Sequence, residues 1–134
     1  MYEIKIISDF AAAHRLRNFR GQCENLHGHN WRIEVVIRST RLDENGMVVD
    51  FAKVKNATRR LLALIDHTYL NDIPYFQTRN PSSENIARFL YEELAKQFDN
   101  NNLWVHSVSA WESHDACATY ITNRNQLPVE GAGK

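Results

Sequence analysis

The sequence predicts an α+β fold in which a four-stranded antiparallel sheet carries two helices on one face. Its 134 residues are 43% hydrophobic, which suits one domain with a core of its own. Two long segments of alternating polarity come first, two segments of helical periodicity follow, and two shorter alternating segments come last. Strands in this ββααββ order pair as hairpins, and the helices then cover one face.

The two long strands are predicted at residues 2–14 and 26–39, where apolar side chains recur at every second position. Alternation with period two points these side chains to one face of the sheet. His14 shares the parity of the apolar residues in the first segment, and His27 and His29 share it in the second. All three imidazoles are therefore expected on the core side.

The first helix is predicted to begin after Asp50, a residue type that caps helix N-termini, and to run through Ile65. Asn45-Gly46 is a turn signal, and residues 47–49 are typical of a short extended piece between that turn and the helix.

The second helix is predicted to begin at residues 82–84 and to end near 99–102, a stretch rich in asparagine. Two strands are expected after it, at 103–112 and 116–122. Four strands in an open sheet leave two unpaired edges, which favour pairing between subunits. An oligomer is therefore expected.

Composition argues against a nucleic-acid or membrane partner. The 16 Lys and Arg residues balance the 16 Asp and Glu residues, and no segment is apolar enough to span a membrane. Two cysteines and no secretion signal indicate free thiols in the cytoplasm, with Cys117 expected in the core. One domain is expected over 1–122, followed by a polar tail at 123–134.

The histidines form the strongest functional signal. His27 and His29 stand two residues apart on one side of a strand, so both can bind the same ion. His14 can supply a third nitrogen from the neighbouring strand, and three nitrogens with one open position describe a catalytic zinc site. The alternative is three ordinary histidines on a half-buried strand, but the trio with its HxH spacing favours metal binding.

Other residue types that carry chemistry lie nearby in sequence. A thiol at Cys23 would ionise more easily beside a metal and could act as a nucleophile or base; it could also be a fourth zinc ligand or an inert thiol. Asp66 could orient the imidazole of His67 for proton transfer. The same pair could equally be a solvated aspartate and a histidine at a helix C-terminus.

Two carboxylates and a group of arginines have open roles. Glu112, at the end of a predicted strand, could accept two hydrogen bonds from an amidine-like ligand edge or could simply be exposed. Glu84 offers the same choice, since an acidic residue also stabilises a helix N-terminus. Arg15, Arg17 and Arg20 could meet a phosphorylated ligand or only be solvated.

Six short motifs in this order resemble the 6-pyruvoyltetrahydropterin synthase and 6-carboxytetrahydropterin synthase family, over residues 10–120. Any one of them would be a weak signal, whereas six in the right order are highly specific. The motifs are FAAAH at 10–14, CxxxHGH at 23–29, GMVVDF at 46–51, DHTYLN at 66–71, PSSEN at 81–85 and WE at 111–112.

The resemblance implies a tunnelling fold, in which trimers join their sheets into a barrel and two trimers stack into a homohexamer with active sites between subunits. It also implies a role for each matching residue. The zinc ligands would be His14, His27 and His29, the catalytic residues Cys23, Asp66 and His67, and the substrate-binding residues Glu112, Glu84 and Ser83.

Three residues between the cysteine and HGH resemble the bacterial carboxy-forming branch. The resemblance then implies a zinc-dependent lyase that converts 7,8-dihydroneopterin triphosphate to 6-carboxy-5,6,7,8-tetrahydropterin, with release of acetaldehyde and triphosphate, in queuosine biosynthesis. The alternatives are pyruvoyl-forming synthesis from the same substrate and a non-catalytic protein that binds zinc and pterin. The chain departs from the family pattern at residues 113–115, where His114 could add a titrating group near the pocket.

Overall fold

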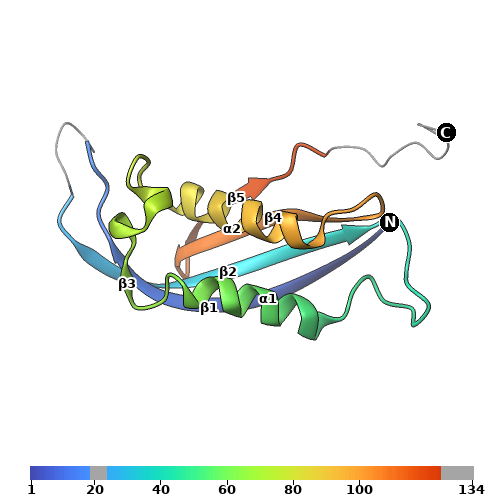
Figure 1. Ribbon diagram of the computed structural model, residues 1–134. Helices are drawn as coiled ribbons and strands as arrows, with labels where there is room; N and C mark the ends of the chain where they lie inside the picture. The colour runs from blue at the N-terminus through green and yellow to red at the C-terminus, as the bar shows by residue number, and fades with distance from the viewer. Residues whose placement is uncertain (19–23, 125–134) are drawn as a thin grey trace.

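The computed structural model describes residues 1–18 and 24–124 and has an α+β architecture with one sheet and two main helices (Figure 1). Both helices lie on the same face of the sheet, as predicted. In chain order the elements are β1 (Tyr2–His14), β2 (His27–Ser39), α1 (Phe51–Ala63), β3 (Thr68–Tyr69), the short 3-10 helices η1 (Leu70–Asp72) and η2 (Pro74–Phe76), α2 (Ser83–Phe98), β4 (Leu103–Ser113) and β5 (Ala116–Ile121).

The sheet has five strands in the order β3-β1-β2-β4-β5, and the prediction of four antiparallel strands was wrong on this point. The extra strand β3 pairs parallel to β1, through Ala12 with Thr68 and Ala13 with Tyr69. A strand of two residues is too short to show any alternation, so only its tertiary pairing reveals it. Residues 47–49, expected as an extended piece, form no strand, and residues 48 and 49 are bends.

The two helices begin where the sequence indicates. The Asp50 carboxylate accepts a hydrogen bond from the Ala52 N–H at 2.9 Å, and the Ser82 hydroxyl accepts one from the Asn85 N–H at 3.2 Å. Each side chain satisfies a backbone donor that has no partner within its own helix. The first helix ends at Ala63, slightly before the predicted end, because the chain turns there towards β1.

The core lies between the helices and one face of β1, β2 and β4. Its apolar rows alternate as expected, with Phe10 stacked on Trp31 at a centroid distance of 6.0 Å. The antiparallel register places Phe10 opposite Trp31 and, four residues further, His14 opposite His27. The histidines therefore continue the buried rows to the end of the sheet, and His14 is only 2% exposed.

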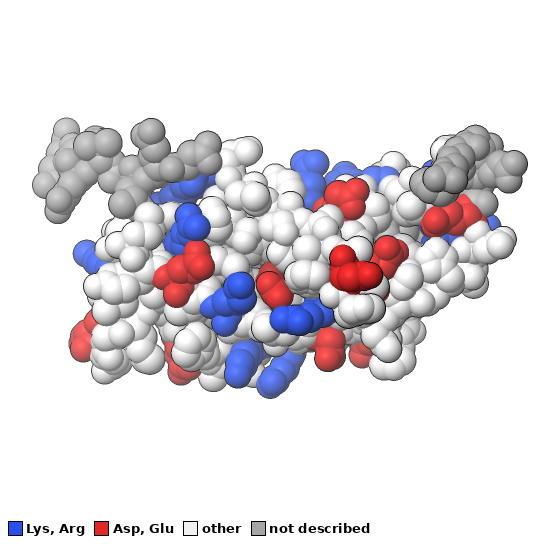
Figure 2. Space-filling model, turned by 180° about the vertical axis from the view of Figure 1, so that it is seen from behind, with Lys and Arg blue, Asp and Glu red and all other residues white. Residues whose placement is uncertain are grey.

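The opposite face of the sheet carries charges of both signs, interspersed over the surface in Figure 2. Glu34 on β2 contacts Lys5 on β1 at 3.7 Å and Arg32 at 3.0 Å, and Arg38 on β2 contacts Glu3 on β1 at 2.9 Å. Opposite charges on neighbouring strands attract one another and leave no strongly basic field.

We expect the imidazole of His106 on β4 to make the free energy of unfolding depend on pH. Its Nδ1 is buried without a partner in the described part of the chain, and burial, aided by Arg38 and opposed by Glu3, lowers its pKa. The unfolded chain then binds the proton more readily, so the free energy of unfolding should fall as pH drops below about 6.5. His106→Asn cannot titrate and should lose less stability between pH 7.5 and 5.5 in urea unfolding; equal losses would contradict this assignment.

Two smaller predictions concern Cys117 and the C-terminal tail. Cys117 is exposed on β5, so its assignment to the core was wrong for the single chain. Of the predicted tail, 123–134, only the first two residues are described, and the Arg124 guanidinium lies over the Trp104 ring at 4.4 Å. The rest of that tail lies outside the described residues. Within them, no helix is both long and apolar enough to cross a bilayer.

Candidate active site

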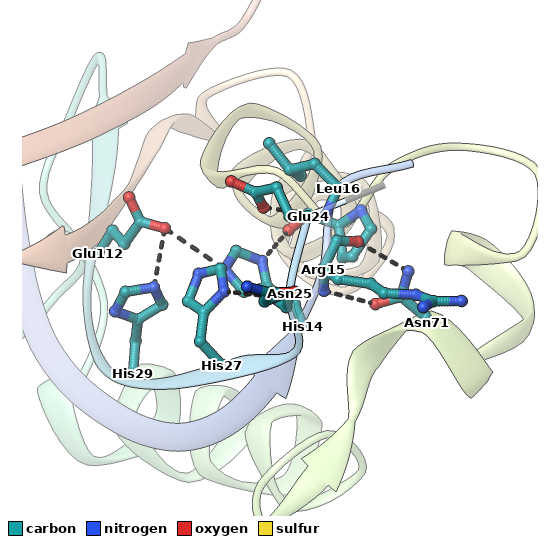
Figure 3. A network of polar contacts seen from close by, with 10 residues as sticks. His14, Arg15, Leu16, Glu24, Asn25, His27, His29, Asn71 and Glu112 are labelled. Carbon is teal, nitrogen blue, oxygen red and sulfur yellow. Dashed lines mark hydrogen bonds and ion pairs between the residues drawn. The ribbon is translucent and has the colours of Figure 1, made fainter. Parts of the chain in front are cut away.

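Three histidines and one glutamate converge at the end of the sheet where β1 stops and β2 starts (Figure 3). The two Nε2 atoms of His14 and His27 are 3.0 Å apart. Glu112 Oε1 lies 3.0 Å from His29 Nε2 and 3.4 Å from His14 Nε2. One donor atom from each of the four residues lies within 4.8 Å of all the others, so the group can hold one metal ion.

Backbone contacts determine which nitrogens of His14 and His27 are free. His14 Nδ1 is 2.7 Å from the Pro81 carbonyl oxygen, and His27 Nδ1 is 2.8 Å from the Asn25 carbonyl oxygen. A carbonyl oxygen only accepts, so each Nδ1 carries the proton, and in the neutral ring each Nε2 presents a lone pair. Such carbonyl contacts are typical of metal-bound histidines.

The donor geometry fits a four-coordinate ion. Two neutral Nε2 lone pairs 3.0 Å apart repel one another unless a cation lies between them. Bonds of about 2.0–2.1 Å in a tetrahedral arrangement separate two nitrogen ligands by roughly 3.3 Å, close to the observed spacing. Imidazole nitrogens with one carboxylate are a donor set that zinc accepts.

His29 adds a third nitrogen with no competing partner. Its Nε2 is buried and makes no hydrogen bond in the described chain, because its contact with Glu112 lacks hydrogen-bond geometry. Burial lowers the pKa of His29, although the neighbouring Glu112 carboxylate opposes this shift. The ring is therefore neutral near pH 7, as a metal ligand must be.

The sequence analysis assigned Glu112 to substrate binding and not to the metal site. It lies near the end of β4, which pairs with β2 through Arg32 and Trp111. That pairing brings its carboxylate to His29, while its side chain stays 37% exposed and open to a ligand. No local sequence pattern could have revealed this contact, because it depends on the register between two strands far apart in the chain.

The structure places the side chains of Asp66 and His67 in contact, as a proton-transfer pair requires. Asp66 Oδ2 lies 2.9 Å from His67 Nδ1, and Asp66 Oδ1 accepts a hydrogen bond from the Ala11 N–H at 2.9 Å. The bond from Ala11 is the main reason why the pKa of Asp66 is lowered. The ionised carboxylate favours the tautomer with the proton on His67 Nδ1, in which Nε2 carries a lone pair.

The backbone of His67 holds the pair in place. Its N–H donates to the Ala11 carbonyl at 2.6 Å, and its φ of 56° lies in the left-handed region. A non-glycine residue costs roughly 1 kcal/mol in that conformation, which tertiary contacts must offset. The 81% exposed imidazole consequently projects from the sheet edge.

A pocket of about 570 Å³ links the two groups of histidines. Both His29 and His67 line it, and small side chains such as Ala12 and Gly28 line much of the rest. This volume lies within the range of small-molecule sites. A ligand there can contact His29 and His67 together.

Of the predicted site residues that the structure describes, only His29 and His67 line this pocket. Cys23 and Arg20 lie outside the described residues. Glu84 is exposed in the first turn of α2, and Ser83 is half-buried beside it. His114 lines a separate pocket of about 250 Å³.

Arg17, considered above as a possible phosphate ligand, and two asparagines that were not considered all make structural contacts with the backbone. The Arg17 guanidinium donates to the backbone carbonyls of Phe76 and Arg79, so it is engaged in structure rather than free for an anion. Asn71 and Asn80, which the sequence analysis did not single out, are engaged with the backbone after His14. Asn71 closes the DHTYLN motif, and this position was the one available signal.

Comparison with known proteins gives a consistent result. The chain matches the family of 6-pyruvoyl tetrahydropterin synthase over residues 3–123. It is 38% identical to an Archaeoglobus fulgidus protein over 115 residues, which cover 86% of this chain and 91% of that protein. It is 37% identical to the 6-carboxy-5,6,7,8-tetrahydropterin synthase of Synechocystis sp. over 120 residues, covering 86% and 89% of the two chains. The solved structure of Caenorhabditis elegans 6-pyruvoyl tetrahydropterin synthase is similar at a TM-score of 0.79 and 28% identity, covering 91% of this chain and 96% of that one.

Proposed function

The chain belongs to the 6-pyruvoyl tetrahydropterin synthase family, and on this premise we propose that it is a zinc-dependent 6-carboxy-5,6,7,8-tetrahydropterin synthase. Its substrate would be 7,8-dihydroneopterin triphosphate. With one water, this yields 6-carboxy-5,6,7,8-tetrahydropterin, acetaldehyde and triphosphate. The pterin ring gains the electrons that the side-chain carbon loses, so no external redox partner is needed.

One observation carries the proposal: His29, one of the four metal donors, and the carboxylate-oriented imidazole of His67 line the same pocket. His14, His27 and His29 would hold the zinc ion. When bound, zinc supplies Lewis acidity to hydroxyl groups of the substrate side chain. The histidine rings are aligned for this role by the carbonyls that accept from their Nδ1 atoms.

The protein groups would perform the proton transfers. His67 Nε2 accepts a proton from the substrate side chain, and Asp66 stabilises the imidazolium that forms. We assign a second proton transfer to the Cys23 thiol, on its place in the CxxxHGH motif. Glu112 would accept hydrogen bonds from the pterin ring, with Glu84 and Ser83 supporting it; the partly exposed carboxylate of Glu112 beside His29 supports this role.

We further propose assembly into trimers whose sheets join edge to edge, with two trimers forming a hexamer. Strand β5 lies at one edge of the sheet, and β3 covers only two residues of β1 at the other. Unpaired strand edges favour this kind of association. In metabolism the product would serve the synthesis of 7-deazaguanine compounds such as queuosine.

Product identity tests the proposal. We expect zinc-loaded protein incubated with 7,8-dihydroneopterin triphosphate to give carboxytetrahydropterin and acetaldehyde by mass spectrometry. Pyruvoyltetrahydropterin would establish the alternative activity, which the similarity to the C. elegans enzyme keeps open. Unchanged substrate with zinc bound would favour a non-catalytic protein.

Cys23→Ala separates catalysis from binding. We expect this variant to retain zinc and lose turnover by about 10²–10⁴-fold, the usual contribution of a general acid or base. Cys117→Ala is the matched control, since this thiol is exposed on β5 and is not one of the metal donors. Full activity in the Cys23 variant would rule out the proposed thiol chemistry.

A further inference from the structure

The segment that carries Asp66 and His67 continues along the free edge of β1 towards the metal donors. At its start, the Asp66 side chain and the His67 N–H both bond the backbone of Ala11. In its middle, β3 pairs with the next two residues of β1. At its end, Asn71 bonds the backbone of Arg15, the residue after His14.

The Asn71 side chain makes two hydrogen bonds with the backbone that follows β1. Its Oδ1 accepts from the Arg15 N–H at 3.0 Å, and its Nδ2 donates to the Arg15 carbonyl at 2.9 Å (Figure 3). The residue is only 7% exposed, so water competes little for these bonds. The amide therefore replaces a strand partner at the point where β1 has already ended.

We propose that Asn71 is a positioning residue for the metal donor His14. The His14 ring must keep Nδ1 on the Pro81 carbonyl and Nε2 within 3.0 Å of His27 Nε2. Clamping the next residue restricts rotation of the His14 backbone, so less entropy is lost when the ion binds. The inference rests on the metal site of the proposed function.

The same clamp links the metal donors to the catalytic pair. Asp66 and Asn71 hold the two ends of one segment to β1, at Ala11 and Arg15, with His14 between these two points. Because strand backbone is stiff over four residues, the separation of His67 from His14 is set by these two contacts. A loosened Asn71 end should therefore disturb the metal donor more than the Asp66–His67 contact.

Asn80 supplies a matched comparison. It makes the same two-bond contact with the backbone of Arg17, accepting at 2.8 Å and donating at 3.0 Å. Arg17 lies two residues further from His14, and its guanidinium is also held by backbone carbonyls. An Asn-to-Asp change at either position keeps size and acceptor but turns the donor into an oxygen facing a carbonyl.

The experiment compares Asn71→Asp and Asn80→Asp with the unmodified chain. Dissociation constants for Zn²⁺ and Co²⁺ are measured by competition with a chromophoric chelator, together with the visible spectrum of the Co²⁺ form and the melting temperature of the metal-free form. We expect Asn71→Asp to weaken Zn²⁺ binding by about 10–100-fold, as loss of an outer contact does, and to alter the Co²⁺ spectrum. Asn80→Asp should stay within about threefold.

Unchanged Zn²⁺ affinity in Asn71→Asp, or an equal loss in Asn80→Asp, would overturn the positioning role. A lowered melting temperature with unchanged affinity would make Asn71 purely structural and would also overturn it. If Asn71→Asp does not fold, Asn71→Ser keeps a hydroxyl for one of the two bonds and is expected to show a smaller loss of affinity. Failure of the unmodified chain to bind Zn²⁺ would instead refute the metal site itself.

Discussion

His27→Ala should abolish turnover and weaken Zn²⁺ binding by more than about 100-fold, beyond the range seen for outer-shell contacts. The substitution removes one of the two Nε2 donors that face each other at 3.0 Å. The ring is half-buried, and its contact through Nδ1 is with the nearby Asn25 carbonyl, so the fold should survive. Chelator competition and atomic-absorption stoichiometry measure the loss directly.

His114→Ala is the control for this experiment. His114 is also an imidazole near the end of the sheet, but it is exposed and lines the separate 250 Å³ pocket. Its removal should leave Zn²⁺ affinity unchanged. Equal affinity in His27→Ala and the unmodified chain would show that the histidine group does not bind the ion.

Asp66→Asn should lower kcat by about 10²–10⁴-fold while leaving Zn²⁺ affinity unchanged. The new amide can still accept from the Ala11 N–H, but its NH₂ group then faces His67 Nδ1. That arrangement favours the tautomer with the proton on Nε2, which removes the base from the pocket. Single-turnover kinetics on zinc-loaded protein separate this chemical loss from substrate binding.

Asp72→Asn controls for the change of charge, since Asp72 is exposed in η1 and lies in the same segment. It should retain normal kcat. The lowered pKa of Asp66 also means that its carboxylate stays ionised throughout the neutral range. Loss of activity between pH 7 and 5 must therefore come from another group, and an Asp66 variant with normal kcat would exclude the dyad.

Strand parity and helix caps made most of the architecture predictable from sequence. Apolar side chains at every second position of β1 and β2 define a buried face whatever the neighbouring elements are, and the histidines follow that parity. Asp50 and Ser82 act on backbone donors of their own helices. Such signals depend only on residues close in sequence, so folding does not change their meaning.

Contacts between distant segments could not be predicted in this way. Strand β3 exists because two residues meet the free edge of β1, and Glu112 reaches His29 because of the β2–β4 register. The contact between the Asp66 and His67 side chains could not be predicted, because it depends on hydrogen bonds from both residues to the Ala11 backbone. Asn71 likewise gains its role from the Arg15 backbone.

The chain alone therefore determined the four longer strands, the two main helices, the trio of imidazoles and the family resemblance, because alternation, capping and motif spacing are local properties. Tertiary structure decided which donors converge, which tautomers the carbonyls of Pro81 and Asn25 impose, and which side chain closes the edge of β1. These depend on register and on distances of a few ångströms between segments far apart in sequence. No local pattern carries that information.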